Sequence, residues 1–190
     1  MDPPRMIGSP RDMQRRRLLR LASGLLLAGC GSAPKPSMQI PSTPQIAAAV
    51  PLLATALVIT VKALPDINPD IRGRSSPLAL RIFELKSAAA FEAADFFALY
   101  EREAATLGGE LVASEQVIVK PEETRTLARV AALETRYLGV VAAIRDLEHS
   151  VWRQVAPVAP PQPLGQAAEG PRTQRFTVVC QRAGIRLVAE

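Results

Sequence analysis

Reactive side chains are few in this chain of 190 residues, which contains two cysteines and one histidine. Cys30 closes the sequence Leu-Ala-Gly-Cys at positions 27–30, and its thiolate would be a good nucleophile. Cys180 lies in the apolar stretch 176–180, which favours a small buried side chain over a reactive thiol. His149 stands in a polar stretch, where a solvated histidine is more usual than a catalytic one. Covalent chemistry is therefore expected at Cys30.

Patterns that usually accompany catalysis are missing from the sequence. No second histidine or further cysteine completes a metal site around His149, and no Gly-x-Ser-x-Gly motif marks a nucleophile. The glycine pair at 108–109 lacks the Lys-Ser or Lys-Thr of a phosphate-binding loop. A Ser-His-Asp arrangement stays open, because the members of a triad can lie far apart in sequence. The prediction is nevertheless no enzyme, with no catalytic residue, no metal site and no bound cofactor.

The segment before Cys30 has the anatomy of an export signal. Arginines at positions 15, 16, 17 and 20 precede an apolar stretch that ends in small residues, and this stretch is too short to span a bilayer. With Cys30 at its end the segment resembles a bacterial lipoprotein lipobox. We predict a lipoprotein signal peptide over residues 1–29 and Cys30 as the first mature residue. An ordinary secretory signal is the alternative, and the paired arginines leave Sec or Tat export open.

Lipidation of Cys30 would decide where the protein is located. In bacterial lipoproteins this cysteine carries a diacylglycerol as a thioether, and its freed amine carries a third acyl chain. Two or more chains hold a protein stably on a membrane. Gly31 follows the cysteine, and resemblance to enterobacterial lipoproteins, in which aspartate at that place retains the protein in the inner membrane, implies sorting to the outer membrane. The expected location is thus the periplasmic face of the outer membrane, with covalent lipid in place of any cofactor.

The formal net charge of +5 comes mostly from the signal segment. Residues 1–29 carry six arginines and two aspartates, so the rest of the chain has a net charge of only +1. No basic stripe with interleaved aromatic residues remains there, and no nucleic-acid partner is predicted. If Cys30 is acylated, Cys180 has no intramolecular partner, so no disulfide framework is expected.

Composition divides the rest of the chain near residue 50. Residues 30–50 are rich in proline, serine and small side chains, and are predicted to form a lipidated, flexible tether. Residues 51–190 are predicted to form the folded domain, because the 161 residues after position 29 suit one core better than two.

Period-two alternation and turn signals predict a mainly β fold for this domain. A first strand over residues 52–62 places Leu57, Ile59 and Val61 on one face. Other strands are predicted for residues 78–85, 111–119, 124–130, 137–144 and 152–158, with a terminal hairpin at 176–180 and 185–189. Long polar, proline-rich loops are expected at 64–77 and 157–171, and a type I turn at 120–123.

One helix is predicted to interrupt the strands. Ser87 can cap it, and the alanine-rich run that follows predicts a helix as far as about Arg102. Phe91, Ala94 and Phe97 would share its apolar face, for which packing is favoured over a ligand pocket. Short strands with one helix predict the fold class: mainly β, a β-sandwich with a short helical insertion.

Several motifs occur in a family order that covers most of the chain after Cys30. They are Asn-Pro-Asp at 68–70, Gly-Arg-Ser-Ser-Pro-Leu at 73–78, Arg-Ile-Phe-Glu-Leu-Lys at 81–86, the aromatic segment 91–100, the segment 137–147 and Trp-Arg at 152–153. Together they resemble the TssJ (VasD/Lip) family of type VI secretion lipoproteins. The resemblance implies a transthyretin-like β-sandwich that is lipid-anchored in the outer membrane. It also implies binding to the periplasmic domain of TssM, in a membrane complex with TssL, and no catalysis.

In that family the loop between the first two strands contacts TssM, and here that loop is residues 64–77. Carried over by position, the predicted partner-binding residues are Asn68, Asp70, Arg72 and Arg74. The alternative is that these polar residues merely solvate a surface loop. Two other functions remain open at this point: a lipid-anchored periplasmic chaperone or pilotin of another envelope machine, and a small periplasmic hydrolase that uses His149.

Overall fold

The computed structural model describes residues 51–166 and 170–190, which belong to one unit, residues 47–190. The predicted signal peptide (1–29), Cys30 and the predicted tether (30–50) lie outside the described residues. Within the described part, no helix is long and apolar enough to cross a membrane.

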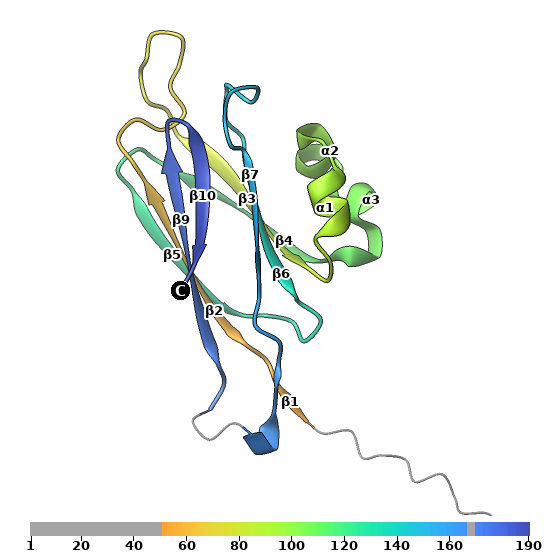
Figure 1. Ribbon diagram of the computed structural model, residues 1–190. Helices are drawn as coiled ribbons and strands as arrows, with labels where there is room; N and C mark the ends of the chain where they lie inside the picture. The colour runs from red at the N-terminus through yellow and green to blue at the C-terminus, as the bar shows by residue number, and fades with distance from the viewer. Residues whose placement is uncertain (1–50, 167–169) are drawn as a thin grey trace, which may run out of the picture. The chain divides into compact units, whose positions relative to one another are not determined.

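Two four-stranded sheets form the domain, as Figure 1 shows. The first sheet has the order β10-β9-β2-β5 and consists of β10 (Gly184–Ala189), β9 (Thr173–Gln181), β2 (Ala56–Ala63) and β5 (Thr124–Val130). The second has the order β4-β3-β6-β7 and consists of β4 (Leu111–Val119), β3 (Leu78–Leu85), β6 (Tyr137–Ala142) and β7 (Arg153–Pro157). All neighbours are antiparallel except β2 and β9, which are parallel. The prediction of a mainly β sandwich is confirmed.

The main core lies between the sheets and follows from the alternation in the sequence. Leu57, Ile59 and Val61 of β2 are fully buried, as predicted, while Lys62 between them and the loop is exposed. The facing side chains come from the other sheet and include Leu78, Leu80, Ile82, Leu138 and Val140. β6 is a central strand with five of its six residues buried.

The helical insertion differs from the single helix that the sequence predicted. Three short helices replace it: α1 (Ala89–Ala93), α2 (Phe96–Glu101) and α3 (Glu103–Leu107), followed by the 3-10 turn η1 (Gly108–Glu110). Asp95 causes the first break, because its carboxylate accepts a hydrogen bond from the Ala98 N–H (2.8 Å) and starts a new helix. Ser87 lies one residue before Ala88, the N-cap of α1. Its Oγ accepts a hydrogen bond from the Ala89 N–H (3.2 Å).

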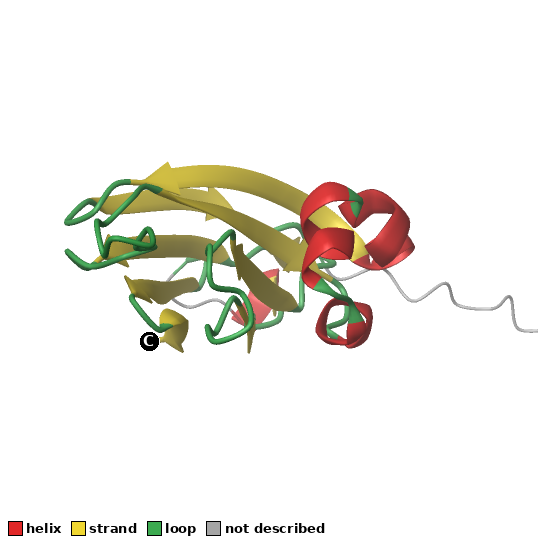
Figure 2. Cartoon of the chain, turned by 90° about the horizontal axis from the view of Figure 1, so that it is seen from above, coloured by secondary structure: helices red, strands yellow, loops and turns green. Residues whose placement is uncertain are grey.

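The break also resets which side chains face inward. Phe97, predicted to share the apolar face with Phe91, is 57% exposed, whereas Leu99 is fully buried. Together with Phe83, Leu107 and other apolar residues, Phe91 and Leu99 form a second core between the helices and the outer face of the β4-β3-β6-β7 sheet. In Figure 2 the three helices lie together at one side of the strands. The packing role predicted for the aromatic segment is thus correct, and Phe91 and Ala94 face inward as predicted, whereas Phe97 does not.

Close approach between these layers requires a glycine on β6. A Cβ atom at Gly139 would lie 2.8 Å from Cζ of Phe91, closer than real Cβ contacts. Two hydrogen bonds hold α1 against β6 and β7, because Nη1 of Arg153 donates to the carbonyl oxygens of Phe91 (2.8 Å) and Ala94 (2.6 Å). The insertion is therefore attached to the sheet by packing and by hydrogen bonds.

Three other predicted elements are corrected. The first strand is divided into β1 (Leu52–Leu53) and β2, and β1 pairs with β8 (Gln162–Pro163). β8 and the 3-10 turn η2 (Leu164–Gln166) lie within the stretch predicted to be a loop over 157–171. The turn at 120–123 is not type I, because Glu122 has φ 65°, the left-handed value that type II requires at its third residue.

Candidate functional site

Three connections meet at one end of the sandwich (Figure 1): residues 64–77 between β2 and β3, residues 143–152 between β6 and β7, and the β9–β10 turn at 182–183. We call this the loop end. All four residues predicted to bind a partner lie in the first connection, as the sequence placed them. The other two connections were not predicted to take part, yet they share a pocket with it.

Asn68 holds the base of the 64–77 loop. It is 7% exposed and has φ 45°, a left-handed conformation that asparagine tolerates better than most residues. Its Nδ2 donates to the carbonyl oxygen of Pro77 (2.9 Å), and its Oδ1 accepts from the Arg145 N–H (3.0 Å). Both ends of the amide are thus bonded within the domain. Direct contact with a partner stays a prediction for Asn68, whereas its positioning role in the loop is observed.

Asp70 organises the tip of the same loop. Its Oδ1 accepts from the N–H groups of Arg72 and Arg74 (2.9 Å each), and its Oδ2 accepts from Nε of Arg74 (2.8 Å). The backbone bond from Arg74 is the main cause that holds the pKa of Asp70 below its ordinary value of 3.8, and the Arg74 guanidinium and the Arg72 N–H add to it. The carboxylate is thus ionised at neutral pH and keeps the tip folded.

The tip itself presents Ile71 and Arg72 to solvent, beside Arg74, which is exposed although it pairs with Asp70. Ile71 is fully exposed and Arg72 is exposed, while the backbone turns at Gly73 with φ 77°. Two backbone bonds close the tip, from Asp70 N to the Arg74 oxygen and from Gly73 N to the Asp70 oxygen (2.9 Å each). An exposed isoleucine on a closed, hydrogen-bonded turn loses little freedom on binding, which makes it suited to contact with a macromolecule.

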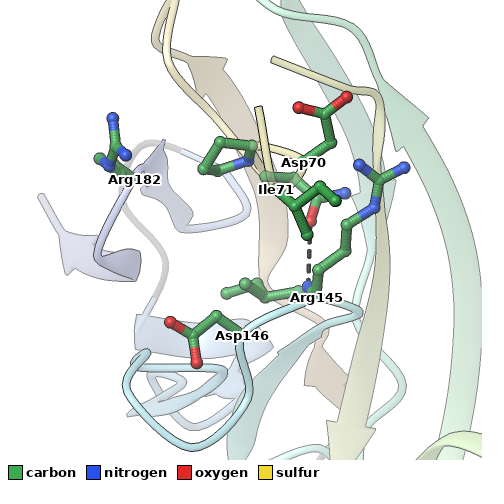
Figure 3. A pocket seen from close by; sticks show the side chains of 8 residues that line it. Asp70, Ile71, Arg145, Asp146 and Arg182 are labelled. Atoms are coloured by element: carbon green, nitrogen blue, oxygen red, sulfur yellow. Dashed lines mark hydrogen bonds between the residues drawn. The ribbon is translucent and has the colours of Figure 1, made fainter. Parts of the chain in front are cut away.

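A pocket of about 440 Å³ lies at the base of the loop (Figure 3). The 64–77 loop contributes Pro69, Asp70 and Ile71 among others, the β6–β7 connection contributes Ile144, Arg145 and Asp146, and the β9–β10 turn contributes Arg182. Its volume lies within the range of small-ligand pockets, although charged residues make up much of its lining.

Further hydrogen bonds join the three connections. Nη1 of Arg145 donates to Oγ of Ser76 in the first loop (3.1 Å). The N–H of Val151 donates to the Ala183 oxygen (3.0 Å), and its own oxygen accepts from the Ile185 N–H (2.8 Å). At Gly184, with φ 124°, a Cβ atom would lie 2.3 Å from the Val151 oxygen, so only glycine allows this approach. The pocket walls are therefore attached to one another before any partner binds.

A second polar cluster, around Glu84 on β3, serves the fold. Glu84 is 4% exposed, accepts from Oγ1 of Thr135 (2.8 Å) and pairs with Nε of Arg129 on the opposite sheet (3.1 Å). A buried carboxylate that is paired and hydrogen-bonded in this way connects the two sheets and the 131–136 turn.

The reactive residues of the sequence are not assembled into a catalytic site within the described part of the chain. His149 is exposed, and Asp146 (2.7 Å from Nδ1) is its one hydrogen-bond partner among the described residues. Cys180 is buried in the main core, and burial raises the pKa of its thiol to about 12, so it stays protonated. No group of three or more metal-binding side chains occurs among residues 51–166 and 170–190.

Sequence reasoning missed three residues of the loop end. Ile71 could have been noticed, since it is a bulky apolar side chain directly between two charged residues, Asp70 and Arg72. Arg145 and Arg182 carry no comparable signal, because they lie far from the loop in sequence and only the fold brings them to its base.

The fold and the loop end define a class of protein: a β-sandwich module that presents a hydrogen-bonded polar loop at one end. The family model described as type VI secretion lipoprotein, VasD, EvfM, TssJ, VC_A0113 matches residues 55–182. The chain therefore belongs to the type VI secretion lipoprotein family, as its motifs predicted.

Solved structures agree with this assignment. TssJ1 from Pseudomonas aeruginosa, a type VI lipoprotein, is 39% identical with a TM-score of 0.64, over 72% of this chain and 97% of that one. Lip from Serratia marcescens, a membrane-bound component of the type VI secretion system, is 27% identical with a TM-score of 0.64, over 70% and 96%. A chain in the structure of the TssM C-terminal domain (869–1107) from EAEC shares the fold, at 21% identity and a TM-score of 0.55, over 70% and 97%. A search of curated sequences found no match.

Proposed function

We propose that this protein is a subunit of the type VI secretion membrane complex that joins the outer membrane to TssM. Lipid on Cys30 would hold it at the periplasmic face of the outer membrane, and the 64–77 loop would bind the periplasmic domain of TssM, in a complex that includes TssL. Family membership and the likeness to a membrane-bound component, Lip, support the membrane part of the proposal.

The observation that carries the binding part is the tip of the 64–77 loop. Asp70 and the backbone bonds hold it closed, and Ile71 and Arg72 stand exposed on it. A pre-organised tip has little conformational entropy to lose, and an arginine offers several donors to an acidic surface. The chain in the TssM C-terminal domain structure that shares this fold supports the choice of partner.

Anchoring is tested with Cys30→Ser in the full chain. Without the thiolate no diacylglycerol can be attached, so the variant is expected in the soluble periplasmic fraction while the wild type sediments with membranes. Cys180→Ser is the matched control, because it changes the other cysteine and leaves the anchor. Membrane association of Cys30→Ser to the wild-type extent would contradict the lipid anchor.

Partner binding is tested by calorimetry of the full chain in detergent with the TssM periplasmic domain. Arg72→Glu combined with Arg74→Glu is expected to weaken binding about tenfold or more, since charge reversal at an interface costs more than 1 kcal/mol. Ile71→Ala isolates the apolar contact and leaves the Asp70–Arg74 pair intact. Arg172→Glu reverses an exposed charge just before β9, at the opposite end of the sandwich from the loop, and should not change the affinity. Equal affinities of all variants would exclude the loop as the binding site.

A further inference from the structure

The charged side chains that line the pocket at the base of the 64–77 loop differ in how many hydrogen bonds they make. The two carboxylates of the pocket are both engaged: Asp70 by three bonds from Arg72 and Arg74, and Asp146 by Nδ1 of His149 at 2.7 Å. The side chain of Arg182, by contrast, has no hydrogen bond or ion pair with any described residue, and that of Arg145 has one, to Ser76. Donors on the two guanidinium groups are thus in excess of the acceptors around them.

Apolar surface lies between these donors. Pro69 and Ile71 of the loop and Ile144 of the β6–β7 connection line the same pocket. In the view of Figure 3, Arg182 and Arg145 lie on the two sides of Ile71. An arginine beside apolar surface recognises a carboxylate well, because its planar fork donates hydrogen bonds to both carboxylate oxygens at once.

We propose that this pocket, between Arg145 and Arg182, receives an acidic segment of the periplasmic domain of TssM, with a carboxylate bound by the guanidinium groups and an adjacent apolar side chain against Ile71. The inference rests on the proposed function and extends it to two residues outside the loop. It makes the loop only one wall of the interface, while the β6–β7 connection and the β9–β10 turn supply the charged part.

Pre-organisation supports this assignment. Asn68 connects the loop to Arg145, Ser76 accepts from Arg145, and Val151 connects the β6–β7 connection to the β9–β10 turn. The three walls therefore have fixed relative positions. The conformational entropy of ordering them is lost on folding and not on binding.

Arg182→Gln in the full chain, titrated with the TssM periplasmic domain by calorimetry, is the main test. Loss of a charge-assisted pair in this pocket is expected to weaken binding about tenfold or more, with a smaller dependence of the affinity on salt. Arg186→Gln is the matched control, because Arg186 is an exposed arginine of the same hairpin that does not line the pocket.

Arg145 requires its own control, because its side chain also supports the loop. Arg145→Gln removes the charge and the hydrogen bond to Ser76, whereas Ser76→Ala removes only that bond. Arg145→Gln is expected to weaken binding at least several-fold more than Ser76→Ala. Equal effects of the two would assign Arg145 to loop support and would overturn its part in the pocket.

Charge exchange identifies the bound group. Arg182→Glu should lose binding, and replacement of exposed Asp and Glu residues of the TssM domain by Lys, one at a time, should restore it for the carboxylate that enters the pocket. If the wild type binds, the tip variants fail and Arg182→Gln binds as the wild type does, the pocket inference is wrong and the proposed function stands. If the wild type does not bind the TssM domain at all, the proposed function itself is wrong.

Discussion

Two proline-rich connections of this domain have similar composition but are held in different ways. The loop at 64–77 is closed by its own side chains, Asn68 and Asp70, and its base is also attached to Arg145, while its tip bonds only within the loop. The connection at 158–172 is held by other segments: Leu164 N donates to the Pro51 oxygen (2.8 Å), β8 pairs with β1, and Oε1 of Gln174 accepts from the Ala159 N–H (2.7 Å).

This difference shows why only one of the two is a candidate binding loop. The hydrogen bonds of the tip join residues 70–74 to one another, and Ile71 on this tip is fully exposed. In the second connection the backbone groups are used to attach the first described residues, 51–53, to the domain. Proline content alone does not distinguish these outcomes, whereas an Asn or Asp able to bond the nearby backbone does.

The largest contrast is expected from the two amides that hold these connections. Asn68→Ala leaves the part-buried Pro77 oxygen and Arg145 N–H without their partner and should lower the free energy of unfolding by about 2 kcal/mol, with loss of TssM binding. Gln174→Ala removes a similar pair of bonds, to Ala159 and Pro157 (3.2 Å), but at a more exposed place, and should cost about 1 kcal/mol with binding unchanged.

Urea denaturation and calorimetry with the TssM domain measure both quantities. Asn68→Gly is a useful third variant, because it keeps the left-handed backbone accessible and removes only the side-chain bonds. If Gln174→Ala weakened TssM binding as much as Asn68→Ala, the two connections would not differ in function as we infer.

A smaller effect is expected at a matched pair of glycines. Gly73 and Gly170 lie in the first and the second connection, with φ 77° and 90°, and neither has an atom within 4 Å of a Cβ position. Alanine at either place should therefore cost about 1 kcal/mol of stability, through backbone strain alone. Only Gly73→Ala should also weaken TssM binding, because it distorts the tip that carries Ile71 and Arg72; a binding loss of equal size in Gly170→Ala would contradict this.

The smallest effect concerns the pH dependence of the loop tip. The pKa of Asp70 is lowered by folding, so its contribution is fully present above its ordinary value of 3.8 and is lost as the pH falls through the lower folded value. The amide resonances of Arg72 and Arg74 should therefore shift together in strongly acidic solution and stay constant from pH 5 to 8. Asp70→Asn should abolish this titration, and a shift retained in that variant would assign it to another group.

Much of the fold could be predicted from the sequence, because alternation reports directly on a sandwich whose sheets bury one face each. The strands with regular alternation, such as the one with Leu57, Ile59 and Val61, were located closely. The errors lie where a single side chain changes the local backbone: Asp95 divides the helix, and Glu122 accepts a left-handed conformation that the sequence gives no reason to expect.

The candidate site was predictable only in part. Position in the family indicated the 64–77 loop, and its polar residues are where that prediction placed them. The separate roles of these residues were not predictable, because a buried Asn68 and an exposed Arg72 look alike as members of a polar loop.

By itself the sequence determined the alternating strands of the domain and the family motifs, and it predicts an export signal that ends at Cys30 and a proline-rich segment after it, since all of these depend on residues close to one another in the chain. The tertiary structure decided which side chains are offered to a partner. Arg145 and Arg182 reach the base of the loop only because β6–β7 and β9–β10 turn at the same end of the sandwich as β2–β3. Such proximity depends on strand pairing between distant segments, which local patterns do not contain.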